Sequence, residues 1–123
     1  MNENILLEDL EIYQSSQKIG EAIWAMVMKW EYFERKALGE QLIRAADSIA
    51  ANIAEGYGRY FFKDRKQFCY YSRGSLMETK AWLAKAFQRK LISEIEYEAL
   101  LSELKNLHFK LNVYIKKLRQ NSE

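Results

Sequence analysis

The chain contains no proline among its 123 residues, and this absence constrains its fold more than any other feature of the sequence. Proline is excluded from helix interiors, whereas loops, turns and sheet edges use it regularly. A chain of this length without proline is therefore expected to consist of long helices with short connections. Because the length suits one domain with a real core, we predict a single domain over residues 1–123.

Apolar residues recur in steps of three and four along four segments, which is the spacing of one helix face. The first segment runs from about Glu8 to Phe33, the second from about Leu38 to Glu55, and the third from about Asp64 to Lys90. A fourth begins after Ser93. Four amphipathic helices with short turns predict an all-α fold, an antiparallel up-down four-helix bundle.

Three signals mark helix ends. Gly56 is expected to stop the second helix. Asp64 is expected to cap the third helix, and Ser93 with Glu96 three residues later forms a capping-box pattern for the fourth. In the fourth helix His108 occupies a heptad position among leucines, which is typical of a core or interface residue.

The helices carry more apolar residues than one inward stripe needs. Seven large side chains lie beside the inward positions: Trp24, Val27, Trp82, Phe87, Leu100, Leu107 and Tyr114. One small bundle has difficulty burying all of them, and excess apolar surface usually marks a partner interface. We therefore predict that the chain assembles into a homo-oligomer.

The content of cysteine and histidine excludes most enzyme chemistry. Cys69 is the only cysteine and His108 the only histidine, so an internal disulfide, a cysteine zinc cluster and most histidine zinc or triad sites are excluded. The Glu-x-x-His motif of di-iron bundles is absent. We predict that the protein is not an enzyme and that it has no metal and no cofactor.

Charge and targeting signals point to a cytoplasmic protein. Lys and Arg number 19 against 17 Asp and Glu, a net charge of +2, which is low for a dedicated duplex-DNA binder. Local basic patches can still bind nucleic acid. The start MNENILLEDLEIYQ resembles no signal peptide, and no run is apolar enough for a membrane span, so no membrane partner is expected.

Two basic clusters are candidates for nucleic-acid contacts. They contain Arg59, Lys63, Arg65 and Lys66 after the second helix, and Lys116, Lys117 and Arg119 near the end of the fourth. Three aromatic residues, Tyr60, Phe61 and Phe62, lie within the first cluster. If they are exposed, they could stack on bases while the cations pair with phosphates. The alternative, which we favour from sequence, is that they plug the end of the bundle and the cations are merely solvated.

A polar cluster is predicted where the second and third helices meet. It contains Asn52, Glu55, Arg59, Ser75 and Glu78. Carboxylates beside an arginine could perform acid–base or metal chemistry. The alternative is a hydrogen-bonded network that fixes the register of two closely packed helices. The small residues around Asn52 favour the network, because they leave little room for a substrate.

The stretches LGEQLIRAADSIAANIAEGYGR and FCYYSRGSLMET together resemble a known family, the four-helix-bundle proteins first described as products of intervening sequences in bacterial 23S ribosomal RNA genes. The matching positions are Gln41, Leu42, Arg44, Ala45, Ala46, Ser48, Ile49, Asn52, Ile53, Ala54, Glu55, Gly56, Gly58, Arg59, Gly74, Ser75 and Glu78. Ile43 stands where arginine is frequent, and ERKALG replaces a proline-bearing segment before the second helix. Both departures lie outside the central motif.

The resemblance implies a bacterial protein that forms a homo-oligomeric bundle, a pentameric ring. It also implies an architecture similar to that of the accessory protein of diversity-generating retroelements, which binds a reverse transcriptase and nucleic acid. The family supplies no catalytic residue to carry over. We therefore expect a non-enzymatic, self-assembling bundle of poorly defined role with modest affinity for RNA or other nucleic acid. The alternative is an adaptor of the retroelement type that binds a reverse transcriptase.

Overall fold

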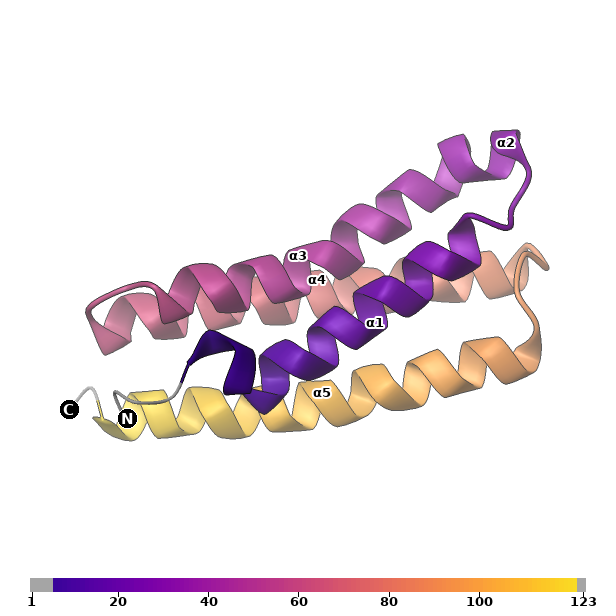
Figure 1. Cartoon of the computed structure of the whole chain (residues 1–123). Helices are drawn as coiled ribbons and strands as arrows, with labels where there is room; N and C mark the ends of the chain where they lie inside the picture. The colour runs from indigo at the N-terminus through magenta and orange to yellow at the C-terminus, as the bar shows by residue number, and fades with distance from the viewer. Residues whose placement is uncertain (1–5, 122–123) are drawn as a thin grey trace.

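Four long helices pack side by side in alternating directions in the computed structural model, which describes residues 6–121 (Figure 1). Each helix packs on its neighbour in sequence, and the first also contacts the last, so the bundle closes. No β-strand occurs within residues 6–121, which confirms the all-α prediction. The four helices are α1 (Glu11–Val27), α3 (Glu40–Tyr57), α4 (Phe62–Gln88) and α5 (Glu94–Asn121).

Three short segments flank the long helices. A 3₁₀ turn, Leu7–Asp9, precedes α1. The short helix α2 (Tyr32–Glu34) runs through a π-helical segment, Arg35–Gly39, directly into α3. Because π-helical turns are rare and often accompany functional sites, the entry into α3 is a candidate position for a functional site.

All four long helices contribute to one apolar core. Burying leucine and isoleucine side chains of this size contributes about 1.5–3 kcal/mol each, which is the main force that holds the bundle together. The largest fully buried side chains are Ile19, Ile23, Leu38, Leu42, Ile49, Ile53, Leu76, Leu83, Leu104, Leu107, Leu111 and Leu118.

The first helix is shorter than its apolar pattern predicts. The prediction of a helix to Phe33 is wrong, because α1 ends at Val27 and the chain turns through the next three residues. Trp30 is buried although it lies in this turn, and its amide donates to the carbonyl oxygen of Val27 at 2.9 Å. The apolar spacing therefore continues past the end of the helix, whereas the side chain of Phe33 is 74% exposed.

The chain buries some of the apolar residues that were expected to be in excess. Leu100 and Leu107 belong to the core, whereas His108 is only half-buried. The inward face of α5 is thus turned slightly from the predicted heptad.

Val27 is also buried, while the side chain of Trp24 remains 50% exposed. Self-association remains a prediction. The exposed apolar surface available for it is smaller than the sequence suggested.

The capping box at the start of α5 is confirmed, and the cap predicted for α4 is wrong. The amide of Glu96 donates to Oγ of Ser93 at 3.1 Å, and the amide of Ser93 donates to Oε1 of Glu96 at 3.1 Å. In α4 the helix begins at Phe62, and the preceding Phe61 is extended and supplies no side-chain cap. Asp64 therefore lies inside the first turn, where its charge still favours the helix dipole.

Gly56 does not stop the second long helix, because α3 continues through Tyr57. Its role is to let α3 and α4 approach each other. A Cβ at Gly56 would lie 3.0 Å from Cβ of Phe68 and 3.1 Å from the carbonyl oxygen of Arg65. The second contact is with backbone, which cannot move aside as a flexible side chain would. The missing side chain thus sets the spacing of the two helices next to their turn.

We expect Gly56→Ala to destabilise the protein by about 1–2 kcal/mol, because overpacking against α4 outweighs the better helix propensity of alanine. Gly74→Ala is the matched control, since nothing lies within 4 Å of a Cβ at that helical position. It should stabilise the protein by up to about 1 kcal/mol. Urea unfolding followed by circular dichroism measures both changes, and equal stabilisation by the two substitutions would contradict the close approach.

Candidate nucleic-acid interface

The two basic clusters of the sequence come together at one end of the bundle. Arg59–Lys66 covers the turn between α3 and α4 and the first turns of α4, and Lys116–Arg119 lies near the end of α5. Figure 1 shows this turn and the end of α5 at the same end of the molecule. Because α4 and α5 are antiparallel neighbours, the first turns of α4 lie beside the last turns of α5.

Tyr70 of α4 contacts one cation from α4 and one from α5. Nη2 of Arg119 donates to the phenol oxygen at 3.2 Å, and the guanidinium of Arg73 lies 5.0 Å from the ring centroid. The hydrogen bond from Arg119 lowers the pKa of Tyr70, and the positive charges of Arg119, Lys66 and Arg73 lower this pKa further. The surface around the phenol is therefore electropositive.

The positive surface continues along the contact between α4 and α5. Nη1 of Arg73 donates to Oδ1 of Asn112 on α5 at 2.8 Å. Farther along, burial lowers the pKa of His108 below 6.5, and the charges of Lys80 and Arg73 lower it further, so this histidine is neutral at pH 7. We call these residues the basic seam: Lys66, Tyr70, Arg73, Lys80, His108, Asn112 and Arg119.

The cations of α4 in the basic seam repeat every seven residues, and this spacing keeps them on one face of the helix. From Lys66 to Lys80 the seam extends over roughly 21 Å, at 1.5 Å per residue. Within residues 6–121, neither these two lysines nor Arg73 forms an ion pair with a carboxylate. A row of cations that are not ion-paired with carboxylates is suited to a polyanion.

Only some of the predicted basic residues belong to the seam. Lys66 and Arg119 do, whereas Lys117 lines a groove between α1 and α5 together with Glu11. Lys63 is exposed in the first turn of α4, and Lys116 is exposed near the end of α5.

Arg59 and Arg65 are engaged in building the turn between α3 and α4. Arg59 pairs with Glu55 at 3.4 Å, and its guanidinium lies 4.8 Å from the ring centroid of Phe68. Nε of Arg65 donates to the carbonyl oxygen of Arg59 at 2.6 Å, and its guanidinium lies 5.5 Å from the ring centroid of Phe62. These two arginines hold the turn in one conformation.

The aromatic residues of this turn are divided between core and solvent. Phe62 packs against the core, as the plug interpretation predicts. For Tyr60 and Phe61 that interpretation is wrong, since their side chains are 84% and 63% exposed. Both residues precede the first helical residue of α4, so neither is on the face that the helix turns toward the bundle.

Sequence reasoning missed Arg73, Lys80 and Asn112. The spacing of Lys66, Arg73 and Lys80 could have revealed one face of a helix. The contribution of α5 could not be found in this way, because it depends on which face of each helix meets the other.

The predicted polar cluster separates into three groups in the structure. The first joins α3 to α4: Nδ2 of Asn52 donates to the carbonyl oxygen and to Oγ of Ser48 at 2.9 and 3.0 Å, and Oγ of Ser75 donates to Oγ of Ser48 at 2.9 Å. In the core beside it, Oγ of Ser72 donates to the carbonyl oxygen of Ile49 at 2.8 Å. These bonds fix the register of the two helices.

The carboxylates of the predicted cluster lie outside this network. The second group is the exposed pair of Glu55 and Arg59. In the third, Glu78 accepts a hydrogen bond from Nε1 of Trp82 at 3.2 Å within α4. The geometry therefore does not bring Glu55 and Glu78 together with Asn52 as a single acid–base site.

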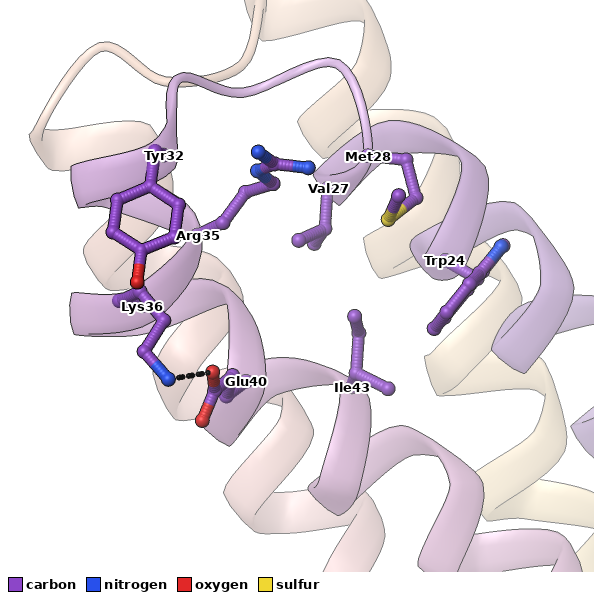
Figure 2. A pocket seen from close by; sticks show the side chains of 8 residues that line it. All are labelled: Trp24, Val27, Met28, Tyr32, Arg35, Lys36, Glu40 and Ile43. Carbon is purple, nitrogen blue, oxygen red and sulfur yellow. Dashed lines mark ion pairs between the residues drawn. The ribbon is translucent and has the colours of Figure 1, made fainter.

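An apolar groove of about 280 Å³ lies at the opposite end of the bundle, between the end of α1 and the start of α3 (Figure 2). Figure 2 shows aromatic and aliphatic side chains around it, with the ion pair of Lys36 and Glu40, 2.9 Å long, at its edge. We call it the α1–α3 groove, and its lining residues are Trp24, Val27, Met28, Tyr32, Arg35, Lys36, Glu40 and Ile43.

The described residues offer little for catalysis. Cys69 is buried, and burial raises the pKa of its thiol to about 12, so the thiol stays protonated and is a poor nucleophile. No group of three or more histidine, cysteine or acidic side chains within residues 6–121 could hold a metal ion. The helices of the same residues are all too short or too polar to cross a bilayer.

Residues 8–113 match a family model described as 23S rRNA-intervening sequence protein. The fold is similar to that of a crystal structure from Bacteroides thetaiotaomicron, a protein of unknown function from the S23 ribosomal protein family. The two share 20% sequence identity with a TM-score of 0.77, over 85% of this chain and 98% of the other. Among curated proteins, none matches this chain.

A double-mutant cycle tests whether the hydrogen bond between Ser48 and Ser75 fixes the register of α3 and α4. Ser48→Ala, Ser75→Ala and the double variant should show a coupling free energy of about 0.5–1.5 kcal/mol in urea unfolding, because each single substitution already breaks the bond. The control cycle of Ser48→Ala with Glu78→Ala should show coupling near zero. Equal coupling in both cycles would instead support the single network predicted from sequence.

Proposed function

The chain belongs to the family of 23S rRNA-intervening sequence proteins, and from this premise we propose that it is a non-enzymatic, self-assembling cytoplasmic protein that binds RNA through its basic seam. The observation that carries the proposal is that Arg119 of α5 and Arg73 of α4 both contact Tyr70, with Lys66 one helical turn before it on α4. Cations repel one another, so an arrangement that concentrates them is stabilised when an anion binds.

The chemistry of the basic seam fits a phosphate backbone. Lysine and arginine side chains of α4 supply charge along about 21 Å of helix. Arginine also donates hydrogen bonds to phosphate in a planar fork, which lysine cannot do. Binding of this kind follows the backbone and does not read sequence. With a net charge of +2 per chain, we expect modest affinity from one subunit.

Self-assembly would raise this affinity by repeating the basic seam. We propose that a second copy of the chain covers the α1–α3 groove, because Trp24, Met28 and Tyr32 line it with exposed large apolar side chains. Monomeric proteins rarely expose contiguous apolar surface of this kind. An assembly also gives a single RNA several seams to contact, which increases avidity without any new type of contact.

The groove also supports the second candidate function, an adaptor that binds another protein such as a reverse transcriptase. The apolar lining would then receive a segment of the partner. The mass of the protein in solution distinguishes the two candidate functions. Self-assembly covers the groove, whereas an unassembled chain leaves the groove open to a partner.

A salt series tests the basic seam. The affinity for single-stranded oligouridine should fall steeply with salt for the wild type. For Lys66→Gln/Arg73→Gln the slope of log K against log salt should be shallower by about 1.4, or about 0.7 for each phosphate that the variant no longer neutralises. Fluorescence anisotropy between about 50 and 200 mM salt measures both slopes.

The matched control is Lys18→Gln/Lys29→Gln, which removes the same charge from α1 and the turn after it. This control should keep the wild-type slope, because neither lysine belongs to the basic seam and all the cations of α4 are retained. Identical slopes for all three proteins would exclude the basic seam as the binding surface.

Light scattering tests self-assembly. At micromolar concentration the wild type should have a mass of several times 14.6 kDa, and Trp24→Glu should reduce that mass by placing a charge in the α1–α3 groove. The control is Ile95→Glu, an exposed apolar residue in the first turn of α5. A wild type that scatters as a monomer refutes self-assembly, and a Trp24→Glu protein of unchanged mass refutes the role of the groove.

A further inference from the structure

We propose that the nucleic acid bound by this protein is unpaired RNA, whose bases stack on Tyr60 and Phe61 at the end of the basic seam. This inference rests on the proposed function and adds to it a class of ligand. We call the two residues the aromatic platform. Their exposure is not accounted for by the core, to which neither contributes.

The rings of the aromatic platform are open to a ligand. The side chains are 84% and 63% exposed, and the two rings pack edge to face with centroids 4.9 Å apart. An edge-to-face pair covers one face of one ring only, so flat aromatic surface remains available for a base. Ring faces of this kind stack on any base, because every base has a π-face.

The aromatic platform is held in place from both sides. Before it, the amide of Arg59 donates to the carbonyl oxygen of Gly56 at 3.1 Å. After it, the amides of Asp64 and Arg65 each donate to the carbonyl oxygen of Phe61 at 3.1 Å. Across it, the side chain of Arg65 donates to the carbonyl oxygen of Arg59. A turn tied in this way loses little conformational entropy when a ligand binds.

Cations adjoin the platform on the side of α4. Lys63 is exposed in the first turn of the helix, and Lys66 begins the basic seam one turn later. A strand whose phosphates follow the seam can therefore place its next bases over the platform. Charge distinguishes this occupant from an apolar protein segment, since a partner helix would not need a row of cations beside two aromatic rings.

The aromatic platform selects against a regular duplex. Paired bases stack on one another inside a helix and present only their edges and backbone to a protein. An unpaired base offers its face, and one stacked base contributes a factor of roughly 5–150 in affinity. The basic seam alone binds either form, so the preference for unpaired RNA should come from Tyr60 and Phe61.

The experiment compares two RNA probes at one salt concentration: oligouridine of about 15 nucleotides and a blunt RNA duplex of the same length. The wild type should bind oligouridine at least about fivefold more tightly than the duplex. Tyr60→Ala/Phe61→Ala should weaken oligouridine binding about tenfold or more and leave duplex binding unchanged. The matched control, Ile95→Ala/Phe109→Ala, removes two exposed apolar side chains of α5 and should change neither affinity.

The seam variant Lys66→Gln/Arg73→Gln separates this inference from the proposed function, because it should weaken the binding of both probes. Equal wild-type affinity for the two probes, or unchanged oligouridine binding after removal of the platform, overturns the inference and leaves RNA binding by the seam intact. The inference is also overturned if the platform variant binds both probes more weakly by the same factor. If neither probe binds at about 50 mM salt, the proposed function and the inference both fail.

Discussion

The close packing of α3 on α4 is the contact on which the rest of the structure depends. Gly56 brings the backbones together beside the turn, and the hydroxyl groups of Ser48 and Ser75 join the helices farther along. The close approach at Gly56 and the hydrogen bond between the two serines hold the helices in one register. The rotation of α4 about its own axis is thereby fixed, and with it the choice of residues that face the core, α5 and solvent.

The basic seam and the aromatic platform both follow from that rotation. Once Leu76 and Leu83 point into the core, Lys66 and Arg73 must lie toward α5, because their spacing along the helix is fixed. The turn before α4 is equally constrained, since Arg65 holds it from within the helix. One tight helix pair, with Arg65 holding the turn, thus positions a row of cations and two exposed rings.

The motif shared with the 23S rRNA-intervening sequence proteins lies mainly on these two packed helices. Gly56, Ser48 and Ser75 belong to it and have clear packing roles in the structure, whereas Glu78 belongs to it and only accepts a bond from Trp82. Most of the motif therefore describes how the bundle is built. The surfaces that we propose for RNA and for a second copy lie largely outside it, on α4, α5 and the end of α1.

The sequence by itself determined the helical fold, the long helices α3, α4 and α5, and the capping box of Ser93, because these depend on local spacing and on bonds between near neighbours. It could not place the end of α1, since buried Trp30 continues the apolar spacing beyond the helix. Only the tertiary structure decided that Tyr70 of α4 and Arg119 of α5, 49 positions apart in the sequence, are joined by a hydrogen bond. The physical reason is that local preferences fix which face of a helix is apolar, whereas the meeting of two polar faces depends on how whole helices pack.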